Sequence, residues 1–118
     1  MDAEGLKDLF APFGAVTVKR MFGGHGVYAD GLCFAIESRG EVFVKVDAEN
    51  QPEFVAAGSK PFVYNAKGRD MTMAYWLLVA GAYDDDDVLK RWAGLGLSAA
   101  QRAAAAKAKP RPRAKKPK

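Results

Sequence analysis

The first apolar positions of the chain recur with the period of a helix. They fall at i, i+3, i+4 and i+7, at Leu6, Leu9, Phe10 and Phe13. Asp2 stands before this segment as a candidate N-cap, and Pro12 and Gly14 follow near its expected end. The pattern predicts a short N-terminal helix with one apolar face.

The next segments have the period and composition of strands. Residues 15–22 are rich in β-branched side chains, and in 41–47 three valines alternate with charged or aromatic residues. Gly23–Gly26 is expected to interrupt the extended chain, whereas Asp30-Gly31 is a two-residue hairpin signal and Ser38–Gly40 turns again. We therefore expect antiparallel hairpins built from four extended segments, over 15–22, 27–29, 32–37 and 41–47.

The second half begins with a short helix and two more strands. Pro52 near the start and Gly58 at the exit bound the helical segment, as proline and glycine commonly do. Strands are expected over 61–65 and 71–79, joined by a turn over 66–69.

The chain then becomes helical. Asp84–Asp87 suit the positive N-terminal end of a helix dipole, and apolar residues follow on one helical face, at Val88, Leu89, Trp92 and Leu95. An alanine-rich helix is expected over 97–108, after a bend or break at Gly94 and Gly96.

These elements predict one α+β domain. Its antiparallel sheet has about five strands, and an N-terminal helix, a short middle helix and C-terminal helices pack on it. The expected domain spans residues 1–106, because alternating proline, lysine and arginine from residue 109 onward oppose packing. Residues 107–118 are expected to form a disordered basic tail.

The net charge of +4 is concentrated in this tail. The preceding 106 residues hold 11 basic and 14 acidic side chains, a net −3, which argues against a basic nucleic-acid-binding body. The tail is expected either to bind DNA or RNA phosphates without reading sequence or only to aid solubility. Its seven cations are Lys107, Lys109, Arg111, Arg113, Lys115, Lys116 and Lys118.

The N-terminus is acidic and no apolar run reaches the roughly 18 residues of a membrane span. We therefore expect a cytoplasmic protein without a membrane segment. Cys33 is the single cysteine, so no intramolecular disulfide is expected, and its apolar neighbours predict a small core residue.

The residues that could bind a cofactor or a metal are better explained by structural roles. Gly24, Gly26 and Ala29, with Asp47 about 20 residues on, fit a dinucleotide fingerprint, but a hairpin is expected where the fingerprint needs a helix. His25 is expected in an exposed loop, and with Cys33 it supplies too few ligands for zinc. We therefore expect no catalytic, cofactor-binding or metal-binding residues.

Basic residues alternate with aromatic ones on the expected strands. Lys19, Arg20 and Lys45 lie close in sequence to aromatic residues, namely Phe22, Tyr28 and Phe43. Such a pattern fits a nucleic-acid platform, or a half-exposed sheet face covered by lysine stems. The body's net charge of −3 favours the sheet face.

Several of these segments in order resemble the N-terminal domain of the TfoX/Sxy family, bacterial regulators of competence. The resemblance covers roughly residues 3–105 and rests on the segments 18–28, 30–31, 34–36, 42–47, 62–64 and 73–76 and on Trp92. The motif and contact residues are Arg20, Met21, Phe22, Gly23, Gly24, Gly26, Tyr28, Gly31, Phe34, Lys45, Tyr64, Tyr75 and Trp92.

The resemblance implies an α+β domain without known catalysis. Full-length competence regulators of the family are thought to assist a cyclic-AMP-responsive activator at promoters, and they carry a second, helical domain. This chain is expected to end in a basic arm instead, and it has Val79-Ala80 where such proteins usually place a proline.

The first hypothesis is therefore a non-enzymatic regulatory or adaptor domain that contacts a protein, such as a transcription factor, and binds nucleic acid through its tail. Its contact surface is expected to hold Arg20, Phe22, Tyr28 and Lys45 around the Gly23–Gly26 loop. The alternative is a small-molecule-binding domain or minor enzyme using the same loop. A homodimer through an exposed sheet edge is a third hypothesis.

Overall fold

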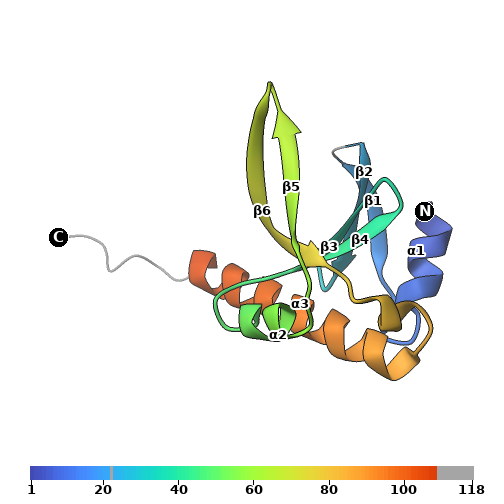
Figure 1. The fold of residues 1–118 in the computed structure, drawn as a ribbon. Coiled ribbons are helices and arrows are strands. Elements are labelled where there is room, and N and C mark those ends of the chain that lie inside the picture. The colour runs from blue at the N-terminus through green and yellow to red at the C-terminus, as the bar shows by residue number, and fades with distance from the viewer. Residues whose placement is uncertain (22, 109–118) are drawn as a thin grey trace.

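A six-stranded antiparallel sheet with its helices on one side forms the fold (Figure 1). The computed structural model describes residues 1–21 and 23–108, with the backbone alone at 64, 66, 70–72 and 108. The strand order is β1-β2-β3-β4-β6-β5, so β1 and β5 are the terminal strands. The α+β fold class is therefore confirmed, with one strand more than expected.

The elements follow the chain in this order: α1 (Ala3–Phe10), β1 (Thr17–Met21), β2 (Gly24–Ala29), β3 (Leu32–Ser38), β4 (Glu41–Lys45), α2 (Gln51–Ala56), β5 (Pro61–Ala66), β6 (Arg69–Leu77), the 3-10 helix η1 (Ala80–Tyr83) and α3 (Asp86–Ala108). The strand expected over 71–79 thus begins and ends two residues earlier. Among the described residues, no helix is long and apolar enough to cross a bilayer.

Helix α1 matches its prediction. The Asp2 carboxylate accepts a hydrogen bond from the Gly5 N–H at 2.8 Å, which caps the helix. Leu6 and Phe10 are fully buried, and the Phe10 ring meets Phe34 of β3 edge-on at 5.3 Å. Helix α1 therefore closes one end of the core.

The glycine-rich segment is mostly strand, contrary to the expected interruption at Gly23–Gly26. Gly24 and Gly26 lie in β2, paired with Met21 and Lys19 of β1. A Cβ on Gly24 would collide with the Glu37 carbonyl oxygen, and a Cβ on Gly26 would collide with the Met21 sulfur. Glycine is required here because neighbouring groups approach the backbone closely, and of the described residues only Gly23 lies in the turn before β2.

Helix α3 is continuous, so the expected break at Gly94 and Gly96 is wrong. Gly96 instead lets the helix lie against the sheet, because a Cβ there would meet the Val44 side chain and, at 3.0 Å, the Phe34 carbonyl oxygen. The acidic start is confirmed as a cap: Asp85 Oδ1 accepts from the Asp87 and Val88 N–H groups.

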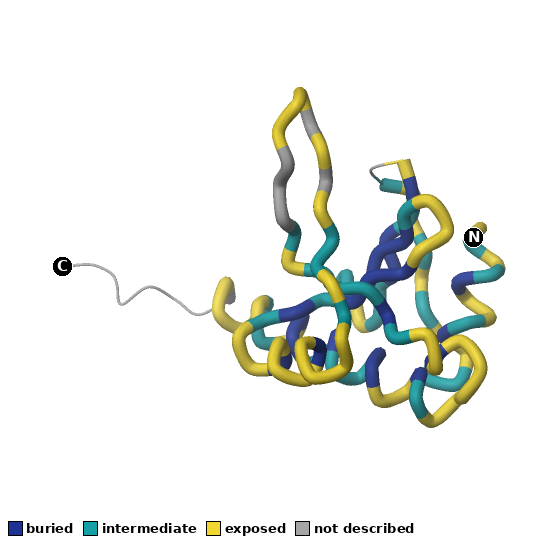
Figure 2. The backbone as a smooth tube through the Cα atoms, in the orientation of Figure 1, coloured by how far each residue is buried: buried dark blue, intermediate teal, exposed yellow. Residues whose placement is uncertain are grey.

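Strands β5 and β6 leave the sheet as a projecting arm, residues 62–73. Strand β4 pairs with β6 over Phe43–Lys45 and Leu77–Tyr75, and one further bond on each side extends this contact. Beyond it the hairpin stands away from the body (Figure 1). Figure 2 shows exposed positions along the arm and buried ones in the sheet and helices.

Candidate contact surface

Among the described residues, the helices lie on one face of the sheet and leave the other face without a helix (Figure 1). Alternation along β4 turns Val42 and Val44 into the buried core beneath α3, and therefore turns Glu41, Phe43 and Lys45 to the opposite face. We call this the open face. Phe62 at the base of the arm packs on Phe43 of this face.

A groove of about 660 Å³ separates the arm from the body on the open face. Its body side includes the β1–β2 and β3–β4 turns, and its other side is β5 with the residue before it. The lining residues are Gly23, Ser38, Arg39, Glu41, Phe43, Lys60, Pro61, Phe62, Val63, Asn65 and Leu77.

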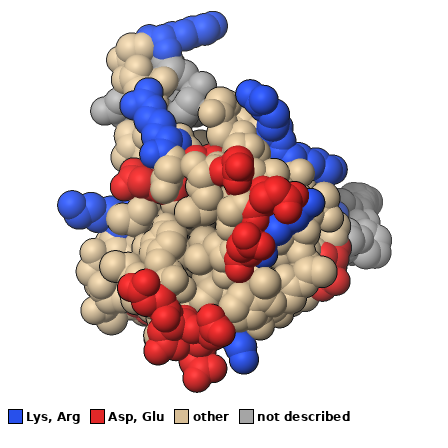
Figure 3. Space-filling view, turned by 90° about the vertical axis from the view of Figure 1, so that its right-hand side faces the viewer, with Lys and Arg blue, Asp and Glu red and all other residues tan. Residues whose placement is uncertain are grey.

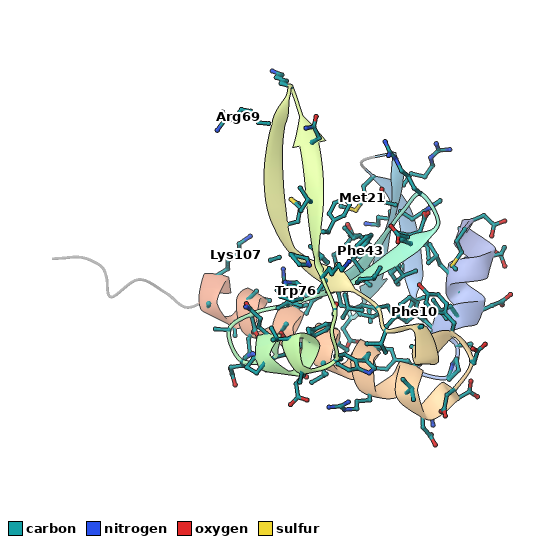
Figure 4. All side chains as sticks on the ribbon, in the orientation of Figure 1. Phe10, Met21, Phe43, Arg69, Trp76 and Lys107 are labelled. Carbon is teal, nitrogen blue, oxygen red and sulfur yellow. The ribbon has the colours of Figure 1, made fainter. Side chains whose placement is uncertain are left out.

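The groove has an aromatic floor and an exposed apolar wall. The rings of Phe43 and Phe62 lie 4.7 Å apart, which leaves Phe43 only 7% exposed although no helix covers it. Figure 4 shows Phe43 near the base of the arm. Val63 on β5 remains 50% exposed, so the groove presents apolar surface to an incoming group.

Two lysine–tyrosine pairs lie around Cys33 on the open face. The Lys19 ammonium lies 4.9 Å from the centre of the Tyr28 ring, and Lys45 lies 5.1 Å from that of Tyr75. The Tyr75 hydroxyl donates to the Cys33 sulfur at 3.6 Å. Cys33 is thus half-buried and lies among polar groups as well as apolar ones.

This arrangement raises the pKa of both tyrosine hydroxyls. Burial is the main cause that raises the pKa of Tyr75 well above its ordinary value, and the Cys33 thiol adds to the effect. Burial and the neighbouring Cys33 likewise raise the pKa of Tyr28. The cluster therefore offers hydroxyl donors and lysine cations at neutral pH, not a phenolate base.

The predicted contact residues divide between the two faces. Tyr28 and Lys45 reach the open face, but Arg20 pairs in register with His25, so strand alternation turns it away from Lys19 and Tyr28. Phe22 lies outside the described residues. The three described residues of the expected surface, Arg20, Tyr28 and Lys45, therefore do not share one face of the sheet.

The other motif residues serve the fold. Phe34 and Trp92 lie in the core, Met21 packs over Gly26, and Gly31 takes the left-handed backbone of a hairpin turn, with φ +76°. Tyr64 is placed in β5 by its backbone. Of the tail cations, Lys107 lies in the last turn of α3, and the remaining six lie outside the described residues, at Lys109, Arg111, Arg113, Lys115, Lys116 and Lys118.

His25 is not the exposed loop residue that the sequence suggested. It lies on β2 with its side chain 20% exposed, and its Nδ1 donates to the buried Glu37 carboxylate at 2.6 Å. The Gly40 N–H also donates to Glu37, at 2.8 Å. These bonds hold the β3–β4 turn beside β2.

Two hairpin turns bordering the arm and groove carry cations in an unusual backbone conformation. Arg39 and Lys67 have φ values of 53° and 54° at the first position of Arg-Gly and Lys-Gly turns. Asparagine, aspartate and glycine are the usual residues there, as in the Asp30-Gly31 turn at the other end of β2. Sequence reasoning missed these cations, although a basic residue before Gly40 and Gly68 marks them.

Charge is divided between the sheet and the helices. Residues 17–45 and 60–77 hold seven basic and four acidic residues, a net +3, whereas the rest of 1–106 holds four basic and ten acidic residues, a net −6. Figure 3 shows one group of acidic side chains at the lower end of the molecule and others across its middle, with basic side chains mainly toward the upper end. The net charge of −3 over residues 1–106 therefore conceals a positive charge on the sheet and arm and a negative charge on the rest of the domain.

Gly24 and Gly26 lack the surroundings that a dinucleotide fingerprint needs. The hairpin expected after Gly26 is confirmed, so no helix begins where the dinucleotide fingerprint needs one. Within residues 1–21 and 23–108, no three histidine, cysteine or acidic side chains cluster as metal ligands.

Comparison with known proteins identifies the domain. The family model of the TfoX N-terminal domain matches residues 8–100. A search of curated proteins gave no match to this chain.

Proposed function

The chain belongs to the TfoX N-terminal domain family, and from this premise we propose that it is a non-enzymatic regulatory adaptor in transcription. It acts by binding a protein partner in the cytoplasm, and its contact surface is the groove beneath the arm. The observation that carries this proposal is the groove itself, where the exposed Val63 of β5 faces the β3–β4 turn that carries Arg39.

The groove has the features of a recognition site for a macromolecule. Pro61, Phe62 and Val63 supply apolar contact along one strand, and Arg39 and Lys60 supply charge beside it. An apolar centre with a polar rim is the usual anatomy of a protein interface. The arm stands clear of the body, so a partner can reach the groove without displacing a helix.

The basic tail has a separate role in this proposal. Its seven cations over residues 107–118 bind DNA or RNA phosphates without sequence preference, and the affinity therefore falls steeply as salt rises. The adaptor thus holds its protein partner through the groove and stays near nucleic acid through the tail.

A small-molecule site is the second candidate, because a groove of about 660 Å³ lies in the range of ligand pockets. The two candidates differ in the kind of molecule that the groove captures. A small ligand would be captured from a protein-free cell extract, whereas the adaptor requires a macromolecule.

The test is affinity capture with the chain truncated after Ala108, with nuclease present, in two valine variants. Val63→Glu places a charge on the groove wall, and Val55→Glu is the matched control on α2, where the valine is 56% exposed. We expect a transcription protein to be recovered with the parent chain and Val55→Glu, and lost with Val63→Glu. Equal recovery in both variants would exclude the groove as the contact surface.

A further inference from the structure

In the part of the chain that the structure describes, cations of the sheet strands and the arm lack the acidic partners that most cations of the helices have. Among the described residues of the helices, four basic side chains pair with a carboxylate within 4.0 Å, at Lys7, Lys90, Arg91 and Arg102, and Lys107 at the end of α3 is the exception. Among the described residues, no ion pair is formed by the sheet-side cations, Lys19, Arg20, Arg39, Lys45, Lys60, Lys67 and Arg69. Within the described residues, the ion-paired cations therefore lie among the helices, and the unpaired ones lie mainly on the sheet and its arm.

From this asymmetry we propose that the groove binds an acidic, extended segment of the protein partner, in which carboxylates alternate with apolar side chains. The inference rests on the proposed function and names the chemistry of the partner at the same site. The carboxylates pair with Arg39 and Lys60, and the apolar side chains pack on Val63 and Phe62. Such pairing gives specificity and steers association.

The apolar wall formed by β5 favours a peptide as the occupant, in addition to the charges of Arg39 and Lys60. Strand β5 is a terminal strand, and extended peptides commonly lie along such strands, with alternate side chains entering pockets. Val63 is half exposed, and burying an apolar side chain against it removes surface from water. A phosphate backbone would satisfy Arg39 and Lys60 but leave this apolar wall uncovered.

Single-stranded nucleic acid fits the open face less well. Its bases bind proteins largely by stacking on aromatic rings. Here the Tyr28 and Tyr75 rings are covered by lysine ammonium groups, and Phe43 is packed against Phe62. These three rings already have partners, so the free cations are better matched by carboxylates.

The chain has an acidic run of its own, Asp84–Asp87, beside the exposed Tyr83. A second copy using this run would bind the groove head to tail. Such a contact does not close on itself as a two-fold dimer does, and it propagates into open assemblies unless its rotation closes a ring. A separate partner is therefore the favoured occupant.

The experiment is selection of a displayed library of random peptides, about twelve residues long, on the chain truncated after Ala108. We expect the selected peptides to be enriched in aspartate and glutamate at positions that alternate with apolar residues. One selected peptide is then labelled, and its affinity is measured by fluorescence anisotropy. Selection of neutral or basic peptides, or no enrichment, would overturn the proposal.

Two double charge reversals locate the binding. Arg39→Glu with Lys60→Glu alters the groove, and Lys7→Glu with Lys90→Glu makes the same change in net charge on the helical side. We expect the first pair to raise the dissociation constant of the selected peptide by about tenfold or more, and the second to leave it within about twofold. Equal loss in both would show that only net charge matters, which would contradict the assigned site.

Other occupants give distinct results. Displacement of the peptide by equimolar oligothymidine would assign the groove to nucleic acid, and concentration-dependent self-association lost in Arg39→Glu with Lys60→Glu would assign it to a second copy. Either result overturns the proposal. If the reversed variant does not fold, Arg39→Asn with Lys60→Gln removes the charges, because asparagine suits the left-handed backbone of residue 39.

Failure of this inference is separable from failure of the proposed function. Loss of protein capture in Val63→Glu, without selection of acidic peptides, leaves the groove as a contact surface for a partner of other chemistry. Selection of acidic peptides without any groove-dependent capture contradicts the adaptor role instead.

Discussion

His25 Nδ1 donates a hydrogen bond of 2.6 Å to Oε1 of Glu37, a carboxylate only 5% exposed. The same carboxylate accepts from the Gly40 N–H and lies 3.6 Å from the N-terminal ammonium of Met1. One buried acid thus ties together β2, the β3–β4 turn and the start of the chain. The turn that it holds carries Arg39, so this network positions one wall of the groove.

Glu37→Gln is expected to destabilise the fold by about 2 kcal/mol at neutral pH, because bonds to a charged group are lost. Burial alone raises the pKa of Glu37, but the bonds from His25 and Gly40 and the N-terminal charge lower it below 4.5 overall. The contribution is therefore present above pH 4.5 and is lost as the pH falls through the folded-state pKa.

Urea unfolding from pH 7 to pH 3 checks this prediction. The free-energy difference between Glu37→Gln and the parent chain should shrink toward the acid end. The control is Glu53→Gln, whose side chain is 47% exposed in its pair with Arg91, where a loss below about 1 kcal/mol is expected. A pH-independent loss in Glu37→Gln would mean that packing, not charge, dominates.

Alanine substitution should separate two glycines of the same strand. Gly24→Ala forces a methyl group against the Glu37 carbonyl, which belongs to the neighbouring backbone, so a loss of about 3 kcal/mol is expected. Gly26→Ala meets the Met21 side chain, which can move, so the loss should be about 1 kcal/mol. Thermal unfolding measures both.

A second substitution tests the cause of the smaller loss. Met21→Ala should reduce the penalty of Gly26→Ala, because it removes the obstructing sulfur, and should leave that of Gly24→Ala unchanged. Additive losses for Met21 and Gly26 would contradict the contact, since neighbouring sites normally couple.

The periodicity of the chain predicted most of the sheet because local signals agreed with the final fold. The valines of β4 alternate in sequence with Phe43 and Lys45, and in the structure the valines face the core while Phe43 and Lys45 face the open face. The Asp30-Gly31 turn and the Asp2 cap needed only their own few residues. Such elements are set locally, and the sequence alone was sufficient for them.

The glycines were misread because their reason lies in distant segments. Gly24 is required by Glu37 of the next strand, and Gly96 is required by Val44 some 50 residues earlier. A sequence pattern shows a glycine's freedom to turn but not the neighbour that needs its small size. The groove was missed for the same reason, since the chain returns from Phe43 to meet Phe62 only after folding.

The charge distribution was misread because the net charge of a segment does not show on which side of the fold its cations lie. The net −3 of residues 1–106 argued against an anionic partner, yet the fold places unpaired cations on the sheet side and paired ones among the helices. Only the ion pairs of the folded structure show which cations have an acidic partner and which have none.

Asn50 should be sensitive to the chemistry of its amide. It is 3% exposed, its Nδ2 donates to the carbonyls of Lys45 and Leu95, and its Oδ1 accepts from the Asp47 N–H at 2.8 Å. Asn50→Ala leaves these groups without partners, so a loss of about 3 kcal/mol is expected. The contact links the end of β4 to α3.

Asn50→Asp should cost more than Asn50→Ala at pH 7, because it places a carboxylate against two carbonyl oxygens. The excess should fall as the pH is lowered, since a protonated carboxyl can donate one of the two bonds. Chemical denaturation of both variants at pH 7 and at an acidic pH measures this excess. Equal stabilities of the two variants at neutral pH would show that the charge escapes to solvent.

Two neighbouring glycines of α3 are expected to respond to alanine in opposite directions. A Cβ on Gly94 has no neighbour within 4 Å, so Gly94→Ala should stabilise the helix by about 1 kcal/mol through its higher propensity. Gly96→Ala gains the same propensity, but its methyl group meets Val44 and the Phe34 carbonyl, so a net loss of about 2 kcal/mol is expected. Thermal unfolding of both variants measures the pair, and Val44→Ala should recover part of the Gly96→Ala loss because it frees space at that contact. Stabilisation by both alanines would mean that α3 does not lie against β4 at Gly96, and the packing that supports the back of the open face would then be wrong.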